Sequence, residues 1–397
     1  MKYIFRLLFV VAIVFGFFSL QNTVKASDEE KEERHAKVCA VSGKKNDVHC
    51  HARVIVDAQG NPKVTTIPSG YGPAQFLGAY NLSGVTSTNQ TIAIVDAYNH
   101  PNIFSDLNTY STTFGIPTMA NCPVSSGSSV SPCFQKVDQN GGTSYPQTNA
   151  GWALEIALDV EVAHAICQNC NILLVEANSS SYTNLMAAVD RARLMGAKII
   201  SNSYGSSEFS GETAYDSHFN HSGIAFTFSS GDSGYGAQYP AASRYVTAVG
   251  GTKLTLNGTT YAGETAWNGA GSGCSAYETK PGFQHDVLCA NRTIADVSAD
   301  ADPNTGAAVY DSVRYGGSRG WFKVGGTSLS APLVAGVYAL SGNYTGAANS
   351  IPYANTASLH DVTSGSNGSC GGTYLCTGLP GYDGPTGLGT PNGVGAF

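Results

Sequence analysis

Two kinds of apolar run alternate along the chain from about residue 70 onward. The short runs are rich in β-branched residues and predict buried strands; they span residues 91–95, 171–175, 198–201, 224–228 and 246–249. The longer runs predict helices, at residues 151–166, 182–195 and 330–340. Continuous apolar strands that alternate with helices predict an α/β fold, in which helices cover both faces of a mostly parallel sheet.

The first 26 residues have the features of a signal peptide. Lys2 and Arg6 precede an apolar run at residues 7–20, and Val24-Lys25-Ala26 then offers small residues for cleavage. The run has about 14 residues, fewer than the roughly 20 that cross a bilayer, although a membrane anchor is the alternative. We expect cleavage after Ala26 and a soluble extracellular protein, with no membrane contact once the signal peptide is removed.

The residues after the signal peptide divide into a short extension and one large domain. Residues 27–70 hold a charge run at 27–34 and a strand-like stretch near 53–56, and we expect them to form an N-terminal extension. Residues 71–397 are rich in Gly, Ser, Tyr and Asn and are long enough to bury a full core, so we expect them to form a single domain.

The composition excludes several classes of protein. With 42% hydrophobic and 12% charged residues, the chain is typical of a globular protein and not of a disordered or coiled-coil one. Lys and Arg number 21 against 28 Asp and Glu, which gives a net charge of −7 at pH 7. No basic excess is available for nucleic-acid phosphates, so nucleic-acid binding is not expected.

The 10 cysteines fall into pairs of near neighbours, which is typical of disulfides in an exported protein. Local pairing is the simplest hypothesis, because spacing alone does not determine connectivity. The CxxC motif within this set is alternatively a redox or zinc site, but it follows a predicted helix and no second CxxC accompanies it. The expected pairs are Cys39–Cys50, Cys122–Cys133, Cys167–Cys170, Cys274–Cys289 and Cys370–Cys376.

Acidic residues lie inside a predicted helix that is otherwise apolar almost all round. Glu155 and Asp159 are four residues apart, so they lie on one face of the helix predicted at 151–166. Two buried carboxyl groups in such proximity repel each other when ionised, and we expect them to share a proton near neutral or acidic pH. This pair suits general acid–base catalysis, whereas a solvated acidic helix face is the structural alternative.

Other candidate residues lie at the ends of strands and at the start of a helix. Asp96 and Asp232 follow apolar strands, at the edge of a parallel sheet where ligands bind, although each also suits a turn or a helix cap. Ser328 follows a glycine pair, a pattern that predicts a tight turn into a helix with Pro332 in its first turn. The helix dipole at such a position favours developing negative charge.

Together these motifs resemble the sedolisins, which are serine-carboxyl peptidases related to subtilisin in fold. The resemblance extends from about residue 70 to residue 397. It rests on Glu-x-x-x-Asp at Glu155, Ser-Ser-Gly-Asp-Ser-Gly around Asp232 and Gly-Thr-Ser-x-x-x-Pro around Ser328, which occur in the family order. It implies a subtilisin-like fold and a serine-type peptidase in which Ser328 is the nucleophile and Glu155 its general base. We expect an endopeptidase, with a tripeptidyl peptidase as the alternative. By the same resemblance, Asp159 orients Glu155, and Asp232 is the acid that stabilises the oxyanion.

The reaction that the resemblance implies needs an acidic medium. Glu155 stands in for the histidine base of a subtilisin-type site, and a carboxylate is a weak base. Proton transfer from Ser328 must therefore be helped by the carboxyl pair and by strong oxyanion stabilisation. Asp232 donates a hydrogen bond only when it is protonated, which an acidic medium achieves. We expect hydrolysis of protein or peptide substrates with an acidic optimum.

The resemblance also implies one structural calcium ion near the C-terminus. Its ligands would be the side chains of Asp361 and Asp383 and the carbonyl oxygens of Val362, Leu379 and Gly381. Such oxygens are the ligands that Ca²⁺ prefers. From the residues alone, a turn-rich loop without a metal is the alternative.

The chain departs from the family pattern in places. Asp96 stands where members often have Glu, and Tyr204 where they often have Trp, so we expect the outer hydrogen-bond network to differ. Members carry a long prodomain, whereas we expect only residues 27–70 before the catalytic region. Glu176, which follows a predicted strand, is a candidate for lining the substrate cleft, but we favour a helix-capping or solvated role.

Two other functions are alternatives. An aspartic peptidase would use Asp232-Ser233-Gly234, but it needs a second Asp-Thr/Ser-Gly triplet, which the sequence lacks, and an all-β fold. A secreted, calcium-stabilised binding domain on an inactive peptidase scaffold is the non-enzymatic alternative. We expect the protein to be a monomer.

Overall fold

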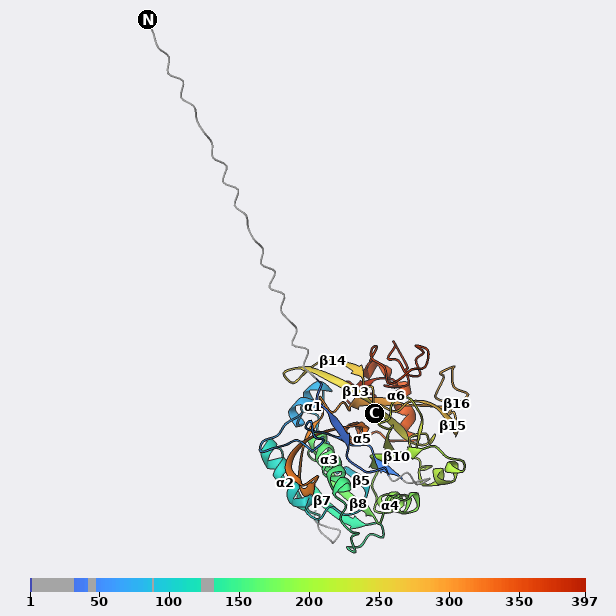
Figure 1. Cartoon of the computed structure of the whole chain (residues 1–397). Coiled ribbons are helices and arrows are strands. Elements are labelled where there is room, and N and C mark those ends of the chain that lie inside the picture. Colours follow the sequence, from blue (N-terminus) through green and yellow to red (C-terminus); the bar gives the residue numbers. More distant parts are fainter. Residues whose placement is uncertain (2–31, 42–47, 88, 123–131) are drawn as a thin grey trace. The chain divides into compact units, whose positions relative to one another are not determined.

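The computed structural model describes residue 1 and residues 32–41, 48–87, 89–122 and 132–397. Residues from Glu33 to Phe397 form one compact unit (Figure 1). The predicted signal peptide, apart from Met1, lies outside the described residues. Of the predicted extension, the described residues from 33 to 70 pack within this unit.

A nine-stranded sheet runs through the unit, in the order β14-β13-β11-β9-β5-β8-β7-β6, with β17 beside β13. Its strand pairs are parallel except for β13 with β14. Strands β9 and β11 are buried at every residue, as expected where apolar runs are covered on both faces. The strands are β5 Thr91–Ala97, β6 Ala120–Asn121, β7 Cys133–Asp138, β8 Asn171–Ala177, β9 Ile199–Asn202, β11 Ala225–Ser229, β13 Thr247–Asn257, β14 Thr260–Ala266 and β17 Val297–Asp300.

Helices α3 (Ala150–Ile166) and α5 (Thr327–Ser341) pack against each other and against the sheet. Helix α3 is buried from Gly151 to Ile166, because its surface is apolar almost all round. In Figure 1, α3 and α4 (Tyr182–Leu194) lie on opposite sides of β5 and β8. The predicted α/β fold is therefore confirmed. The other helices are α1 Pro73–Ala79, α2 Ile103–Phe114 and α6 Ile351–Ala354, with 3₁₀ turns at Glu212–His218, Ala348–Ser350 and Thr356–Ser358.

Residues 35–65 add strands to two smaller sheets. In the first sheet, β1 (His35–Lys37) pairs with β3 (Arg53–Ile55). Strand β19 (Ser318–Gly325) pairs with β3 and with β4 (Val64–Thr65). It also pairs with β18 (Ala307–Tyr315). In the second, β10 (Tyr204–Ser207) pairs with β2 (His49–Cys50) and with β12 (Gln238–Tyr239). The N-terminal strands therefore lie beside β10 and beside the end of β19, which leads directly into α5.

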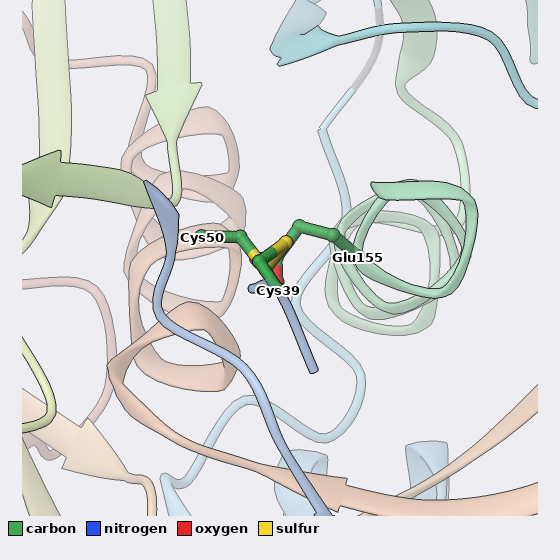
Figure 2. Close-up of side chains that lie close together, drawn as sticks. All are labelled: Cys39, Cys50 and Glu155. Carbon is green, nitrogen blue, oxygen red and sulfur yellow. A yellow bond between two sulfur atoms is a disulfide. The ribbon is translucent and has the colours of Figure 1, made fainter. Parts of the chain in front are cut away.

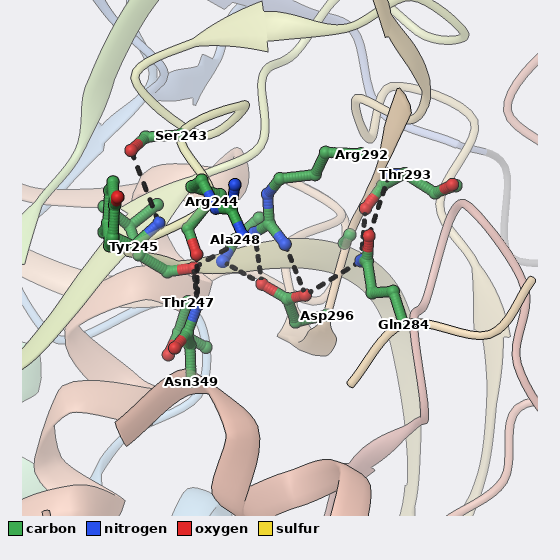
Figure 3. A network of polar contacts seen from close by, with 12 residues as sticks. Ser243, Arg244, Tyr245, Thr247, Ala248, Gln284, Arg292, Thr293, Asp296 and Asn349 are labelled. Atoms are coloured by element: carbon green, nitrogen blue, oxygen red, sulfur yellow. Dashed lines mark hydrogen bonds and ion pairs between the residues drawn. The ribbon is translucent and has the colours of Figure 1, made fainter. Parts of the chain in front are cut away.

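A buried polar network ties β16 (Asn291–Ile294) and the segment that follows it to the start of strand β13 (Figure 3). Arg292 and Asp296 are both unexposed, and Nη2 of the arginine lies 2.6 Å from Oδ2 of the aspartate. Asp296 Oδ2 also accepts the backbone N–H of Ala248 at 2.7 Å, while Arg292 donates to the carbonyl of Val246 at 3.0 Å. The network stabilises a region with little regular structure. The strands not yet described are β15 Gly273–Thr279, β20 Leu359–His360 and β21 Thr390–Pro391.

Disulfides join all the cysteines in the expected local pairs, which confirms that prediction. The CxxC motif, Cys167 with Cys170, is a disulfide that follows α3. Among the described residues, none of the helices is both long enough and apolar enough to cross a membrane.

Candidate active site

Helix α3 carries Glu155 and Asp159 into the interior, where neither side chain is exposed. Asn149 begins the helix by accepting hydrogen bonds from the N–H groups of Gly151 and Trp152, at 3.1 and 3.2 Å. Burial raises the pKa of Glu155, and repulsion from Asp159 raises it further. Burial also raises the pKa of Asp159. The pair therefore retains a proton readily, and the alternative of a solvated acidic face is wrong.

Ser328 lies in the first turn of α5, which begins after Gly326. Its hydroxyl is buried and donates a hydrogen bond to the carbonyl of Ser203 at 3.3 Å. The prediction that Pro332 lies in the first turn is wrong, because the helix begins at Thr327 and the proline lies in the second turn. A proline there has no N–H for the carbonyl of Ser328. The hydroxyl of Ser203 donates to that carbonyl instead, at 3.4 Å.

Asp232 follows β11 and contacts the start of α5. Its Oδ1 accepts hydrogen bonds from the backbone N–H and the hydroxyl of Thr327, at 2.8 and 3.0 Å. Burial raises the pKa of Asp232 to about 6, against the opposing effects of Arg53 and Thr327. Nε of Arg53 lies 3.4 Å from Oδ2. Among the described residues Oδ2 has no hydrogen-bond partner, so it is the oxygen available to carry a proton.

The structure brings these candidate residues into one site. Asp159 and Asp232 raise the pKa of Glu155 and the hydroxyl of Ser328 lowers it, so the groups are within electrostatic reach of one another. The hydroxyl and Glu155 are not aligned as a hydrogen bond in this structure. The arrangement places a serine hydroxyl near a buried carboxyl pair and an acid beside a helix N-terminus, and groups of these kinds can carry out acyl transfer.

Further carboxyl groups continue the buried acids beyond Asp159. Asp96 is unexposed, and its pKa is raised by burial and by repulsion from Asp159. Glu176 is also unexposed, with Oε1 3.4 Å from Nζ of Lys136, and burial raises its pKa to about 7. The interpretation of Glu176 as a capping or solvated residue is therefore wrong. Strands β5 and β8 place Asp96 directly beside Glu176, a pairing that the sequence alone does not show.

Residues 48–53 lie across the site, which the sequence analysis did not predict. The carbonyl oxygen of His51 accepts a hydrogen bond from the N–H of Ser328 at 3.4 Å. Figure 2 shows the Cys39–Cys50 disulfide beside Glu155, where both sulfur atoms and a carboxylate oxygen lie within 4.8 Å of one another. With this segment in place, neither Glu155 nor Ser328 is exposed. The cysteine spacing predicts a small loop but carries no signal for where that loop docks.

The predicted calcium ligands lie together in the C-terminal loops. Asp361 Oδ2 accepts the N–H of Gly381 at 2.9 Å, and Asp383 Oδ2 accepts the N–H of Leu379 at 3.1 Å. Burial, together with repulsion from Asp361, raises the pKa of Asp383 to about 7. Val362, beside Asp361, is buried. Two neighbouring carboxylates beside loop carbonyls are a donor set that fits Ca²⁺.

Known proteins share this sequence pattern. The profile of the Subtilase family matches residues 141–350. Sedolisin from Pseudomonas sp. (strain 101) is 29% identical over 89% of this chain and 65% of its own length. Kumamolisin from Bacillus sp. (strain MN-32) is 28% identical over 82% of this chain and 63% of its own length. Xanthomonalisin from Xanthomonas sp. (strain T-22) is 27% identical, and the chain spans between 45% and 65% of the length of these curated relatives.

Solved structures share the fold. Pseudomonas sedolisin, complexed with two molecules of pseudo-iodotyrostatin, has a TM-score of 0.67 and 27% identity, over 82% of this chain and 96% of that one. A lanthipeptide protease, at 14% identity and a TM-score of 0.50, is similar in fold alone. The mostly parallel sheet is incompatible with an all-β aspartic peptidase, so that alternative is wrong.

Proposed function

We propose that this chain, a sedolisin-type member of the Subtilase family, hydrolyses peptide bonds as a serine-carboxyl peptidase. The observation that carries the proposal is the position of the Ser328 hydroxyl. It lies in the first turn of α5, among carboxyl groups whose pKa values burial raises. Proteins and peptides are the substrates that such a site would take.

In the proposed reaction, the hydroxyl oxygen of Ser328 attacks the substrate carbonyl carbon while its proton passes to Glu155. Asp159 keeps Glu155 in position and adjusts its affinity for that proton. The N–H of Ser328 and a protonated Asp232 donate hydrogen bonds to the oxyanion. Glu155 then gives the proton to the departing amine, and water releases the acyl group from Ser328 by the same steps in reverse.

Asp232 makes the proposed activity acid-dependent. Its carboxyl group donates a hydrogen bond only in the protonated form, and its pKa is about 6. The protonated fraction grows as the pH falls below that value and is lost as the pH rises through it. We therefore expect an acidic optimum, with activity falling on the alkaline side near pH 6.

We further propose that the protein acts outside the cell, which its disulfides support. One calcium ion, held by Asp361 and Asp383 with the carbonyls of Val362, Leu379 and Gly381, would stabilise the C-terminal loops. Bound there, the ion would offset the repulsion between the two carboxylates.

Hydrolysis of a reduced and alkylated protein, followed across the acidic and neutral range after incubation of the chain in acid, tests the proposal. Ser328→Ala should lower the rate by at least about a thousandfold. Ser330→Ala is the matched control, because it removes a buried hydroxyl from the same helix that donates only to the carbonyl of Thr327. This control should keep the activity of the wild type.

A second matched pair tests the carboxyl base. Glu155→Gln should abolish hydrolysis while the far-ultraviolet circular dichroism stays the same. Glu161 is a buried carboxyl residue on the same helix, and it accepts the N–H of Tyr310 at 3.0 Å. The Glu161→Gln variant should therefore stay active. A wild-type chain with no hydrolysis at any pH, with or without calcium, would contradict the proposal and favour a non-catalytic binding domain.

A further inference from the structure

Ser203 and Ser328 are joined by two reciprocal hydrogen bonds. The hydroxyl of Ser328 donates to the carbonyl of Ser203 at 3.3 Å, and the hydroxyl of Ser203 donates to the carbonyl of Ser328 at 3.4 Å. Both residues are unexposed. Ser203 lies between β9 and β10, so the two bonds link the end of a central strand to the first turn of α5.

The carbonyl of Ser328 depends on a donor from outside its helix. In a regular α-helix it would accept the N–H of the residue four positions later. That residue is Pro332, which has no N–H. A buried carbonyl without a partner destabilises the turn that contains it. Because the hydroxyl of Ser203 supplies the missing bond, it helps to fix the turn that carries the nucleophile.

The same hydroxyl acts on Asp159. Burial raises the pKa of Asp159, and the hydroxyl of Ser203 opposes this rise, so the two groups are within reach of each other. Among the described residues, neither carboxyl oxygen of Asp159 has an aligned hydrogen-bond partner. The hydroxyl of Ser203 has one proton, and in this structure it bonds to the carbonyl of Ser328. Ser203 therefore has two acceptors for one proton.

Neighbouring hydrogen bonds fix the backbone on both sides of Ser203. The hydroxyl of Tyr204 donates to Oδ1 of Asn202 at 2.8 Å, so its proton is not available to the carboxyl groups. Nδ2 of Asn202 donates to the carbonyl of Thr227 on β11 at 3.2 Å. Asn202 and Tyr204 are both unexposed. Ser203 is thus held between two buried residues, and its own hydroxyl is the one that reaches Asp159.

The charged groups that face Asp159 are acids. Glu155 lies on the same helix and Asp96 lies on β5, and burial and then repulsion from Asp159 raise the pKa of each. Glu176 lies beside Asp96, on β8. Buried acids in such proximity share protons and titrate together. The protonation of Asp159 therefore changes with pH, and the better acceptor for the hydroxyl of Ser203 changes with it.

We propose that Ser203 is a positioning residue that couples the protonation of Asp159 to the position of the nucleophile, an inference that rests on the peptidase function above. When Asp159 is ionised, its carboxylate attracts the hydroxyl proton of Ser203, because hydrogen bonds to charged acceptors are stronger. The carbonyl of Ser328 then loses its donor. When Asp159 is protonated, it donates to the oxygen of Ser203, whose hydroxyl donates to that carbonyl. The first turn of α5 is then held as the structure shows it.

Ser203→Ala removes the donor from both acceptors. In hydrolysis of a reduced and alkylated protein, we expect kcat to fall about 10–100-fold while KM changes by less than about threefold, because the nucleophile is misplaced and the substrate contacts remain. The acid limb of the rate profile reports loss of a proton from the pair of Glu155 and Asp159. The hydroxyl favours ionised Asp159, so its loss should move this limb up by about one pH unit. Ser203→Thr keeps a hydroxyl and should restore both kcat and the limb.

Pro332→Ala separates the two acceptors. Alanine brings an N–H to the position from which a helical residue donates to the carbonyl of Ser328. Added to Ser203→Ala, it should raise kcat by at least about fivefold, and Pro332→Ala alone completes the double-mutant cycle. The acid limb should stay at its raised position in the double variant, because Asp159 still lacks its donor.

Ser201→Ala is the matched control on the same segment. Its hydroxyl is buried two residues earlier and has no hydrogen-bond partner among the described residues, so this variant should behave as the wild type. If Ser203→Ala does not fold by circular dichroism, Ser203→Cys replaces it, because a thiol is a weak donor.

The two proposals can fail separately. Wild-type kcat and an unmoved acid limb in Ser203→Ala overturn the coupling and leave the peptidase function in place. A lower kcat with an unmoved acid limb, or without recovery on adding Pro332→Ala, shows a structural role alone and also overturns the coupling. A wild-type chain that hydrolyses nothing overturns both proposals.

Discussion

Arg53 holds Asp232 towards its ionised form, and replacing it with methionine should move the pH dependence of catalysis upward. Nε of Arg53 lies 3.4 Å from Oδ2 of Asp232, and the two side chains are 16% and 5% exposed. At an effective dielectric constant of about 20, unit charges at this separation interact by about 5 kcal/mol, or roughly 3.6 pH units. Because the guanidinium keeps part of its hydration, we expect a smaller shift of about 1–2 pH units.

The sign follows from which form of the acid Arg53 favours. A neighbouring cation stabilises the carboxylate, so removing it raises the pKa of Asp232 from about 6 to roughly 7–8. The protonated form then persists to higher pH, and the alkaline limb of the rate profile should move up by the same amount. Lys37 also lowers the pKa of Asp232, but its effect is smaller than that of Arg53. Lys37→Met should therefore give a smaller shift in the same direction.

The assay is the rate of hydrolysis of a reduced and alkylated protein between about pH 3 and pH 9. Arg34→Met is the control, since it removes the same charge from an exposed side chain that donates to the carbonyl of Ala58. The pKa of Asp232 itself is followed by ¹³C NMR in the Ser328→Ala background. An unchanged pKa would refute the electrostatic argument. A raised pKa with an unchanged alkaline limb would show that catalysis does not use this proton.

Three further predictions concern stability and metal binding. Arg292→Met leaves Asp296 buried without its partner and should lower the free energy of unfolding by about 3–5 kcal/mol in urea titration; a loss below about 1 kcal/mol would show that the pair is not structural. Phe228→Ala removes an unexposed ring from β11 and should lower the free energy of unfolding by about 3–5 kcal/mol with an unchanged m value, and wild-type stability would contradict its place in the core. EDTA should lower the Tm of the wild type by differential scanning calorimetry, and Asp361→Asn should remove that response; a wild-type Tm indifferent to both EDTA and calcium would argue against the ion.

The elements of the central sheet could be predicted from the sequence, because runs of apolar residues reveal burial directly. The runs at 91–95 and 171–175 correspond to β5 and β8, and the run at 151–166 corresponds to α3. The sequence predicts that this helix begins at residue 330, three residues after its start at Thr327 in the structure, because a proline such as Pro332 favours the first turn of a helix. The helix accommodates the proline one turn later since the hydroxyl of Ser203 takes over the carbonyl that the proline leaves unbonded.

The candidate site could be predicted only in part. The spacing of Glu155 and Asp159 implies a common helix face, since helical geometry is local. That Asp232 and Ser328 lie beside this pair was implied by the resemblance to sedolisins and not by periodicity. The proximity of Asp96 to Glu176 depends on β5 lying next to β8, which no local pattern reveals. Burial then raises the pKa of both groups, and burial is a property of the packed molecule.

The sequence by itself determined the class of fold, the local disulfides and the acid pair on one helix, because these depend on composition and on residues close along the chain. Only the tertiary structure decided that residues 48–53 lie across the site, with the carbonyl of His51 against the N–H of Ser328. Strands join through backbone N–H and carbonyl groups, which every residue except proline has in full. Side-chain identity therefore predicts that a segment forms a strand but does not predict which strand it pairs with. The partner of β2 is β10, which lies some 150 residues further along the chain.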